Sequence, residues 1–208
     1  MFLGDIVGVS GCNAIHKNLN ECIKKNNIDF IVANGENASN DGVGITKEIA
    51  DSLFDIGIDV GNATNGWEWE SDKIEQVLPF LKWVRFTVAA GTPERYSDIM
   101  FKNSRHTEVF DRAMKNIKYA VELKRKLGLD VTLGIQMVLL PEFADEIIPF
   151  SQLAIDLGVD YGVIKHCSDD EFGTLKVDYE KYEDLYELLH TAEQLSNEKT
   201  KIIVKWDK

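Results

Sequence analysis

Seven short apolar segments, each separated from the next by a stretch with helical patterning, constrain the fold more than any other feature of this 208-residue chain. Strands that follow one another through helices pair in parallel by right-handed crossovers. The sequence therefore predicts an α/β fold of alternating strand-helix units, whose parallel sheet forms a partial TIM-like barrel, with an open doubly wound sheet as the alternative. We expect strands at residues 2–8, 28–34, 58–64, 82–89, 130–139, 160–166 and 201–206, and helices at 13–26, 46–56, 71–81, 108–127, 142–157 and 178–197.

Composition narrows the class of protein and its partners. No Pro/Gly/Ser-rich linker interrupts the alternation, so residues 1–208 are predicted to form a single α/β domain. The formal net charge of −12 disfavours binding to nucleic-acid backbones or anionic membranes, which attract basic surfaces. No apolar run is long enough for a membrane span, and the first residues lack the pattern of a signal peptide. We expect a cytoplasmic protein; its oligomeric state is not predictable from these features.

Polar residues lie at the ends of the first three predicted strands. Both candidate architectures bind ligands at the carboxyl ends of their strands. Hard carboxylate and amide oxygens favour Mg²⁺ or Mn²⁺, and two such cations can clamp a phosphate ester. The polar residues at these strand ends are Asp5, then Asn34, Glu36 and Asn37, and then Asn62.

The opening of the chain carries a resemblance to a known family. MFLGDIVGVSG, DFIVANGENASNDGVGIT and the later GIDVGN, within residues 1–62, resemble the amino-terminal part of the bacterial cyclic-nucleotide phosphodiesterase branch of the calcineurin-like metallophosphoesterases. The resemblance implies that Asp5 is a metal ligand, that Glu36 bridges two metals, that Asn37 lies beside the site, and that Asn62 is a further ligand.

One residue of that pattern is missing. The family continues with a histidine after the asparagine, whereas Ala63 follows Asn62 here, and no Gly-His-x-His pair occurs later. When several groups act as a unit in catalysis, the loss of one of them commonly lowers the rate by several orders of magnitude. We therefore expect a catalytically degenerate protein with a weak residual Mg²⁺ or Mn²⁺ and phosphate site. An active metal-dependent phosphodiesterase is the alternative, and no catalytic residue is assigned.

The remainder of the chain resembles a second family. In residues 63–208 the phrases ATNG, VRFTVAAGTPE and GIQMVLLPE resemble the later strands of a radical S-adenosylmethionine barrel. The strand ends of that family contact the nucleoside and methionine parts of the cofactor. By this resemblance the cofactor-binding residues are Thr64, Asn65, Gly66, Thr87 and Gln136.

This second pattern lacks two of its elements. Ala89 replaces the acidic residue that would precede Ala-Gly-Thr-Pro, which argues against ribose binding. The Cys-x-x-x-Cys-x-x-Cys loop is absent, because Cys12 and Cys22 are nine residues apart and Cys167 is remote, so we expect no [4Fe–4S] cluster. The chain is thus chimera-like. The sequence leaves open a module that binds S-adenosylmethionine, a nucleotide or another small phosphorylated ligand without a cluster, and a recombinant product with no selected function.

Overall fold

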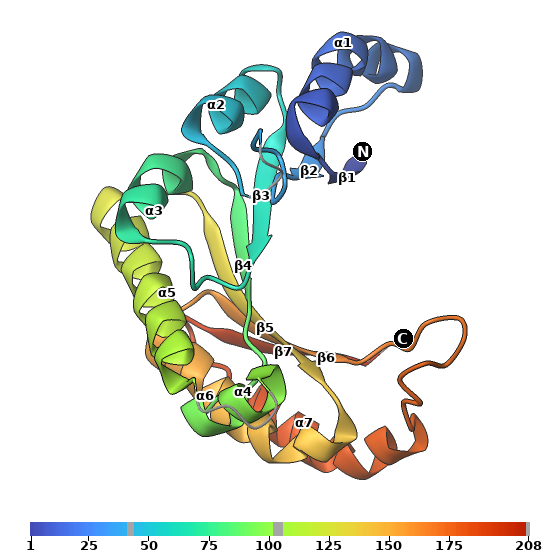
Figure 1. Cartoon of the computed structure of the whole chain (residues 1–208), viewed down its shortest axis with the longest axis vertical. Helices are drawn as coiled ribbons and strands as arrows, with labels where there is room; N and C mark the ends of the chain where they lie inside the picture. The colour runs from blue at the N-terminus through green and yellow to red at the C-terminus, as the bar shows by residue number, and fades with distance from the viewer. Residues whose placement is uncertain (41–43, 102–105, 207–208) are drawn as a thin grey trace. The chain divides into compact units, whose positions relative to one another are not determined.

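The computed structural model describes residues 1–40, 44–101 and 106–206, and its helices and strands alternate as the sequence predicts (Figure 1). All seven predicted strands are present. Their bounds are Phe2–Asp5 (β1), Val32–Asn34 (β2), Asp59–Thr64 (β3), Trp83–Thr87 (β4), Thr132–Leu139 (β5), Tyr161–His166 (β6) and Lys201–Lys205 (β7).

The strands form one sheet in the order β1-β2-β3-β4-β5-β6-β7. The pairs β1–β2, β2–β3, β5–β6 and β6–β7 are parallel. A doubly wound sheet reverses its strand order at a switch point, whereas this order follows the sequence throughout. The predicted α/β fold is confirmed, and the sequential order is that of a β/α barrel rather than of the doubly wound alternative.

Helices connect the successive strands. Their bounds are Gly8–Asn26 (α1), Lys47–Asp55 (α2), Ser71–Val77 (α3), Pro93–Phe101 (α4), Thr107–Leu127 (α5), Ile147–Leu157 (α6) and Tyr186–Gln194 (α7), with 3-10 helices at Leu78–Phe80 (η1), Pro141–Glu146 (η2) and Glu180–Leu185 (η3). The helix expected at 142–157 is divided between η2 and α6, and the one expected at 178–197 between η3 and α7. Left-handed Gly158 ends α6, as the sequence indicated.

Two further helical segments differ from the prediction. Helix α1 begins at Gly8 rather than at residue 13, because Gly8 takes a positive φ of 57° that turns the chain directly out of β1. Helix α4 was not predicted. Its start nevertheless carries a sequence signal, since Thr92 and Pro93 provide a capping residue followed by proline at the first helical position.

The chain divides into two compact units. The first unit comprises Met1–Thr64, Trp69–Arg85 and Glu122–Thr132. In its core α2 contacts β3, which pairs with β2, and Leu53, Val60 and Ala33 of these elements are all fully buried. Gly61 of β3 lets the backbone lie directly against the Trp83 ring, because a Cβ atom at this position would lie 1.8 Å from that ring. That residues 1–208 form a single domain stays a prediction.

The second unit comprises Asn65–Glu68, Phe86–Val121 and Leu133–Lys208. In β5 the side chains alternate: Leu133, Ile135 and Met137 are fully buried, whereas Gln136 is half-buried and Val138 is 42% exposed. Helix α6 packs on this buried side, where Ala154 approaches Gly162 of β6, and α7 contacts β7 beside it (Figure 1). One face of β5 and β6 is therefore covered by helices, and the other presents side chains to solvent.

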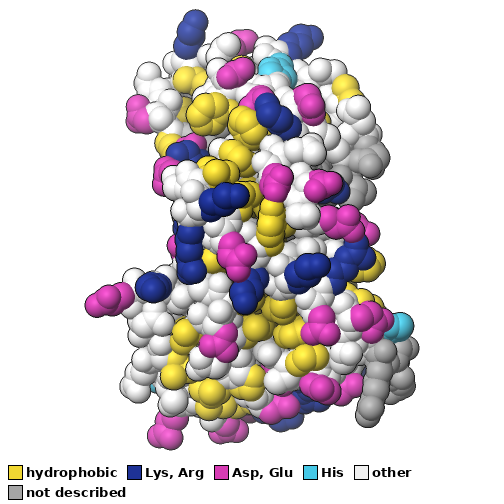
Figure 2. Space-filling model, turned by 90° about the vertical axis from the view of Figure 1, so that its left-hand side faces the viewer, with side chains coloured by type: hydrophobic (Ala, Val, Ile, Leu, Met, Phe, Trp, Pro, Cys, Tyr) yellow, Lys and Arg dark blue, Asp and Glu magenta, His cyan; other side chains and the backbone are white. Residues whose placement is uncertain are grey.

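On the face drawn in Figure 2, acidic and basic side chains are interspersed among smaller hydrophobic groups. No helix among the described residues combines the length and the apolar character that a membrane crossing requires.

Candidate functional site

The carboxyl ends of β1 and β2 meet at one edge of the first unit. The Asp5 carboxylate accepts a hydrogen bond from Asn34 Nδ2 and another, of 3.3 Å, from Asn37 Nδ2. Backbone hydrogen bonds fix the same edge, from Ile6 N to the Asn34 carbonyl oxygen and from Gly8 N to that of Asn37, each 2.9 Å. Asp5 itself is exposed. Two of the four predicted metal ligands, Asp5 and Asn37, are thus in direct contact.

Glu36 and Asn62, the other two predicted metal ligands, differ from each other in burial. The Glu36 side chain is half-buried, and its backbone N–H donates to Asn34 Oδ1 at 3.2 Å. Asn62 is 1% exposed, and its Oδ1 is buried with no hydrogen-bond partner among the described residues. In the register Asn34 pairs with Gly61. Since successive strand side chains point to opposite faces, Asn62 lies on the face opposite to Asn34 and Asp5.

This donor set fits a divalent cation only in part. Asp5, Glu36 and Asn37 supply hard oxygen atoms, but Asn37 turns its Nδ2 rather than its Oδ1 toward Asp5. No group of three or more His, Cys, Asp or Glu side chains suited to a metal occurs in the part of the chain that the structure describes. Within the first unit, His16 Nε2 lies 2.7 Å from Ser52 Oγ, on helices rather than at the strand ends. A cation bound at this edge would therefore take few protein ligands.

The predicted cofactor-binding residues lie in two places. Thr64 ends β3 in the first unit, and the other four belong to the second unit. There, Val88 N donates to the Gln136 carbonyl oxygen at 2.9 Å, which makes Thr87 and Gln136 neighbours on adjacent parallel strands. Thr87 is exposed and Gln136 half-buried. These two side chains share the face of the sheet that the helices of the second unit leave uncovered.

Asn65 and Gly66 form a tight turn. Asn65 Oδ1 accepts a hydrogen bond from Trp67 N at 3.2 Å, and the Gly66 carbonyl accepts one from Asn116 Nδ2 at 2.9 Å. Gly66 has a φ of 77°, and a Cβ atom there would lie 2.9 Å from the Phe86 ring. Glycine is therefore required here by backbone conformation and packing, whether or not a ligand binds.

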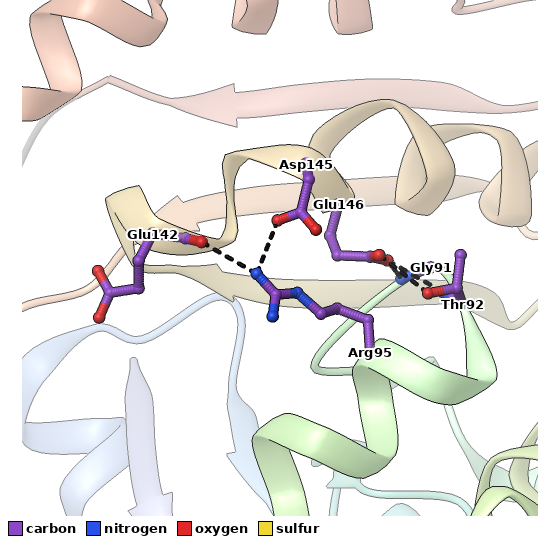
Figure 3. A network of polar contacts seen from close by, with 6 residues as sticks. All are labelled: Gly91, Thr92, Arg95, Glu142, Asp145 and Glu146. Carbon is purple, nitrogen blue, oxygen red and sulfur yellow. Dashed lines mark hydrogen bonds and ion pairs between the residues drawn. The ribbon is translucent and has the colours of Figure 1, made fainter.

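The Gly91-Thr92 loop is held by a buried carboxylate (Figure 3). Glu146 is 4% exposed and accepts hydrogen bonds from Gly91 N at 2.6 Å, Thr92 N at 3.0 Å and Thr92 Oγ1 at 2.9 Å. Beside it, Arg95 Nη2 donates to the Glu142 carbonyl oxygen at 3.1 Å and to Asp145 Oδ1 at 3.0 Å. The donors of this loop are satisfied within the protein, so Glu146 anchors α4 to η2 rather than leaving the loop free to bind an anion.

The three cysteines occupy unrelated environments. Cys12 and Cys22 lie on α1, where Cys12 Sγ is 3.7 Å from the Ala38 carbonyl oxygen and Cys22 Sγ is 4.0 Å from Met1 Sδ. Cys167 is buried at the end of β6 in the second unit. Burial raises the pKa of the Cys12 and Cys167 thiols, which disfavours the thiolate form that iron binds.

A cavity of about 250 Å³ at the carboxyl ends of β6 and β7 was not predicted from the sequence. Glu180 and Glu183 of η3 line it together with five aromatic side chains. These are His166, Tyr179, Tyr182, Tyr186 and Trp206. His166 is 8% exposed, stacks on Tyr182 with ring centroids 4.1 Å apart, and has its pKa lowered by burial. The tyrosine spacing in DYEKYEDLY, which brings three rings to one side of a helical segment, could have indicated it.

Comparisons with known proteins support the fold. A family model described as YmdB-like protein matches residues 1–84, which is less than half of the chain. Comparison with curated proteins found no match. Among solved structures, SuiB of Streptococcus suis, in a crystal structure bound to S-adenosylmethionine, aligns at 12% identity with a TM-score of 0.66, covering 98% of this chain and 50% of SuiB.

Two further structures show the same architecture in other proteins. TYW1 with a lysine-pyruvate adduct aligns at 12% identity and a TM-score of 0.54, covering 88% of this chain and 58% of TYW1. The 3-dehydroquinate dehydratase of Aquifex aeolicus aligns at 14% identity and a TM-score of 0.51, covering 98% of this chain and 78% of the dehydratase. This chain spans about half the length of SuiB, and identities this low establish a common fold only. The fold implied by the second sequence resemblance agrees with these alignments.

Proposed function

We propose that this chain is a catalytically degenerate α/β protein that binds a divalent cation and a phosphate group weakly at the carboxyl ends of β1 and β2. The observation that carries the proposal is the exposed Asp5 carboxylate, which accepts hydrogen bonds from Asn34 and Asn37. Glu36 lies just after the end of β2, at the same edge of the sheet. Mg²⁺ commonly binds through one or two carboxylates and keeps several waters, so Asp5 and Glu36 suffice for a weak site.

Two features of the same edge explain why binding is weak. A cation would have to compete with the two amide groups that already donate to Asp5, and Asn37 would have to turn its amide to offer oxygen. In addition, the register of β2 and β3 places the Asn62 side chain on the opposite face of the sheet from Asp5 and Asn34. The predicted set of four ligands is thereby reduced to Asp5, Glu36 and Asn37, with water completing the coordination.

The start of α1 favours a phosphate beside such a cation. The helix begins at Gly8, three residues after Asp5, with no side-chain cap among the described residues and no acidic residue in its first turn. The amides and partial positive charge of a helix N-terminus attract phosphate. The histidine that would assist a leaving group is absent after Asn62, so the proposed role is binding without turnover.

Titration with Mn²⁺, followed by calorimetry and by the electron paramagnetic resonance signal of free Mn²⁺, tests the site. We expect one weak site that Glu36→Ala and Asp5→Asn abolish. Asp29→Asn removes an exposed carboxylate from the loop before β2 and serves as the matched control, with unchanged binding. Binding of wild-type strength in Glu36→Ala would mean that these residues only end strands and cap helices.

The second candidate is a module that binds S-adenosylmethionine or a nucleotide without an iron-sulfur cluster. It is favoured by the neighbouring Thr87 and Gln136 on the uncovered sheet face, and by the fold of SuiB, whose structure holds S-adenosylmethionine. Calorimetry with S-adenosylmethionine should then show binding that Gln136→Leu weakens and that Asn26→Ala, an exposed substitution in the first unit, does not. Equal affinity in all three proteins would exclude this face.

A further inference from the structure

The aromatic cavity is separate from both sites considered above. In the register His166 pairs with Leu139, whose side chain is fully buried on the helix-covered face of β5. Thr87 and Gln136 lie on the uncovered face. The cavity therefore lies on the opposite side of the sheet from Thr87 and Gln136, between the ends of β6 and β7 and the helices η3 and α7.

The rings of this cavity are fixed in place by their neighbours. Tyr182 is 2% exposed; its hydroxyl donates to the Leu139 carbonyl oxygen at 2.5 Å and accepts from Cys167 N at 3.1 Å. Its ring stacks on His166 at an interplanar angle of 19°. Trp206 meets Tyr186 edge to face at 5.3 Å. Trp206 also lies 4.6 Å from the ring of His190, at an interplanar angle of 32°. The faces of aromatic rings carry negative quadrupole charge, so the ring surface that these contacts leave uncovered attracts cations.

The charged side chains around the cavity also favour a cationic ligand. Glu180 and Glu183 lie one helical turn apart on η3 and are exposed, and neither lysine nor arginine is among the described residues that line the cavity. Lys181, between them, pairs with Asp178 at 3.5 Å. Burial lowers the pKa of His166, which disfavours a positive charge on that ring. An anionic ligand would meet only repulsion from the two carboxylates.

His166 supplies a directional partner. Its Nε2 atom is buried and has no hydrogen-bond partner among the described residues. A buried polar atom without a partner is unfavourable unless a ligand or ordered water satisfies it. His166 lines the cavity, and in the tautomer that leaves Nε2 unprotonated this atom is an acceptor available to the N–H group of a ligand.

We propose that this cavity binds a small primary or secondary organic ammonium ion, held by the aromatic faces of Tyr186 and Trp206, by the carboxylates of Glu180 and Glu183, and by a hydrogen bond to His166 Nε2. A volume of about 250 Å³ corresponds to roughly eight water molecules in the liquid, which matches an amine with one ring or a short alkyl chain. The proposal is independent of the metal site at β1 and β2.

Benzylammonium is a suitable probe, with benzyl alcohol and benzoate as neutral and anionic analogues of similar shape. We expect calorimetry and ligand-observed NMR on the full chain to detect benzylammonium and neither analogue. Glu183→Gln should weaken binding several-fold and reduce its salt dependence, whereas Glu187→Gln, an exposed glutamate of α7 outside the cavity, should leave it unchanged. Equal binding of benzyl alcohol, or the absence of benzylammonium binding at millimolar concentration, overturns the proposal.

Ring variants test the remaining contacts. Trp206→Leu, and independently the half-exposed Tyr186→Leu, should each weaken benzylammonium about two- to thirtyfold, the range of cation–π contributions. His166→Phe keeps a ring stacked on Tyr182 but removes Nε2. It should therefore abolish the preference for benzylammonium over benzyltrimethylammonium, which has no N–H to donate. Unchanged affinity in both Leu variants, or an unchanged preference in His166→Phe, contradicts the assigned contacts.

Discussion

Replacing Glu146 by alanine removes the carboxylate that holds the start of α4 in the second unit. Three donors lose their acceptor: the backbone N–H groups of Gly91 and Thr92 and the hydroxyl of Thr92, at 2.6, 3.0 and 2.9 Å. Hydrogen bonds to a charged group contribute about 1.5–3 kcal/mol each, and a buried donor left without a partner costs about 1–3 kcal/mol. Because the three donors share one carboxylate, their effects do not add fully.

We expect Glu146→Ala to lower the free energy of unfolding by about 3–6 kcal/mol, a large part of the roughly 5–15 kcal/mol that stabilises an ordinary protein. Glu146→Gln retains one acceptor oxygen but turns an NH₂ group toward the donors, and it should cost about 1.5–3 kcal/mol. Urea denaturation followed by far-ultraviolet circular dichroism measures both. The glutamine variant keeps the test informative where the alanine variant fails to fold.

Glu142→Ala is the matched control on the same 3-10 helix. Glu142 is exposed, only its backbone carbonyl contacts Arg95, and its carboxylate points away from this contact (Figure 3). An exposed substitution of this kind should change stability by less than about 0.5 kcal/mol. If Glu146→Ala were no more destabilising than Glu142→Ala, the assignment of Glu146 as the anchor of α4 would be wrong.

Three further predictions concern other parts of the chain. Anaerobic reconstitution with iron and sulfide should yield no [4Fe–4S] spectrum that survives desalting, because properly spaced thiolates are missing; a stoichiometric cluster contradicts this. Gly91→Ala should cost about 1–3 kcal/mol or more in urea denaturation, since its Cβ would lie 2.2 Å from the Phe150 backbone nitrogen, whereas Gly4→Ala, with no atom within 4 Å, should be nearly neutral. NMR titration should give His166 a pKa below its ordinary 6.5. With such a pKa, the unfolded chain binds a proton at His166 more readily than the folded protein does. The free energy of unfolding should therefore decrease as the pH falls below about 6.5. A measured pKa above 6.5 for folded His166 would refute this reasoning.

The fold was largely predictable because strand and helix periodicity is local. Apolar runs such as VTLGIQMVLL identified every strand, and Gly158 identified the end of α6. Helix α4 was missed although Thr92-Pro93 begins it, because the same residues were interpreted as part of a strand end of the second resemblance. Its anchor could not be foreseen, since Glu146 lies 54 residues from Thr92 and only the tertiary structure brings them together.

The sites were less predictable because they depend on register and on side-chain direction. Asn62 lies within β3, which neighbours β2, but Asn34 pairs with Gly61, so the side chain of the adjacent Asn62 lies on the opposite face of the sheet. Thr87 and Gln136 did become neighbours, as parallel pairing of their strands requires. The cavity at His166 combines a strand end with rings of η3 and α7, and no local pattern specifies that Tyr182 stacks on His166.

The rate at which the protein hydrolyses phosphodiesters tests the central claim of binding without turnover most directly. With saturating Mn²⁺, we expect hydrolysis of cyclic nucleotides and of bis(p-nitrophenyl) phosphate to stay at the rate of buffer, in the wild type as in Asp5→Ala. Robust metal-dependent hydrolysis by the wild type that Asp5→Ala abolishes would contradict the account, and would show that the edge formed by β1 and β2 is an active phosphodiesterase site.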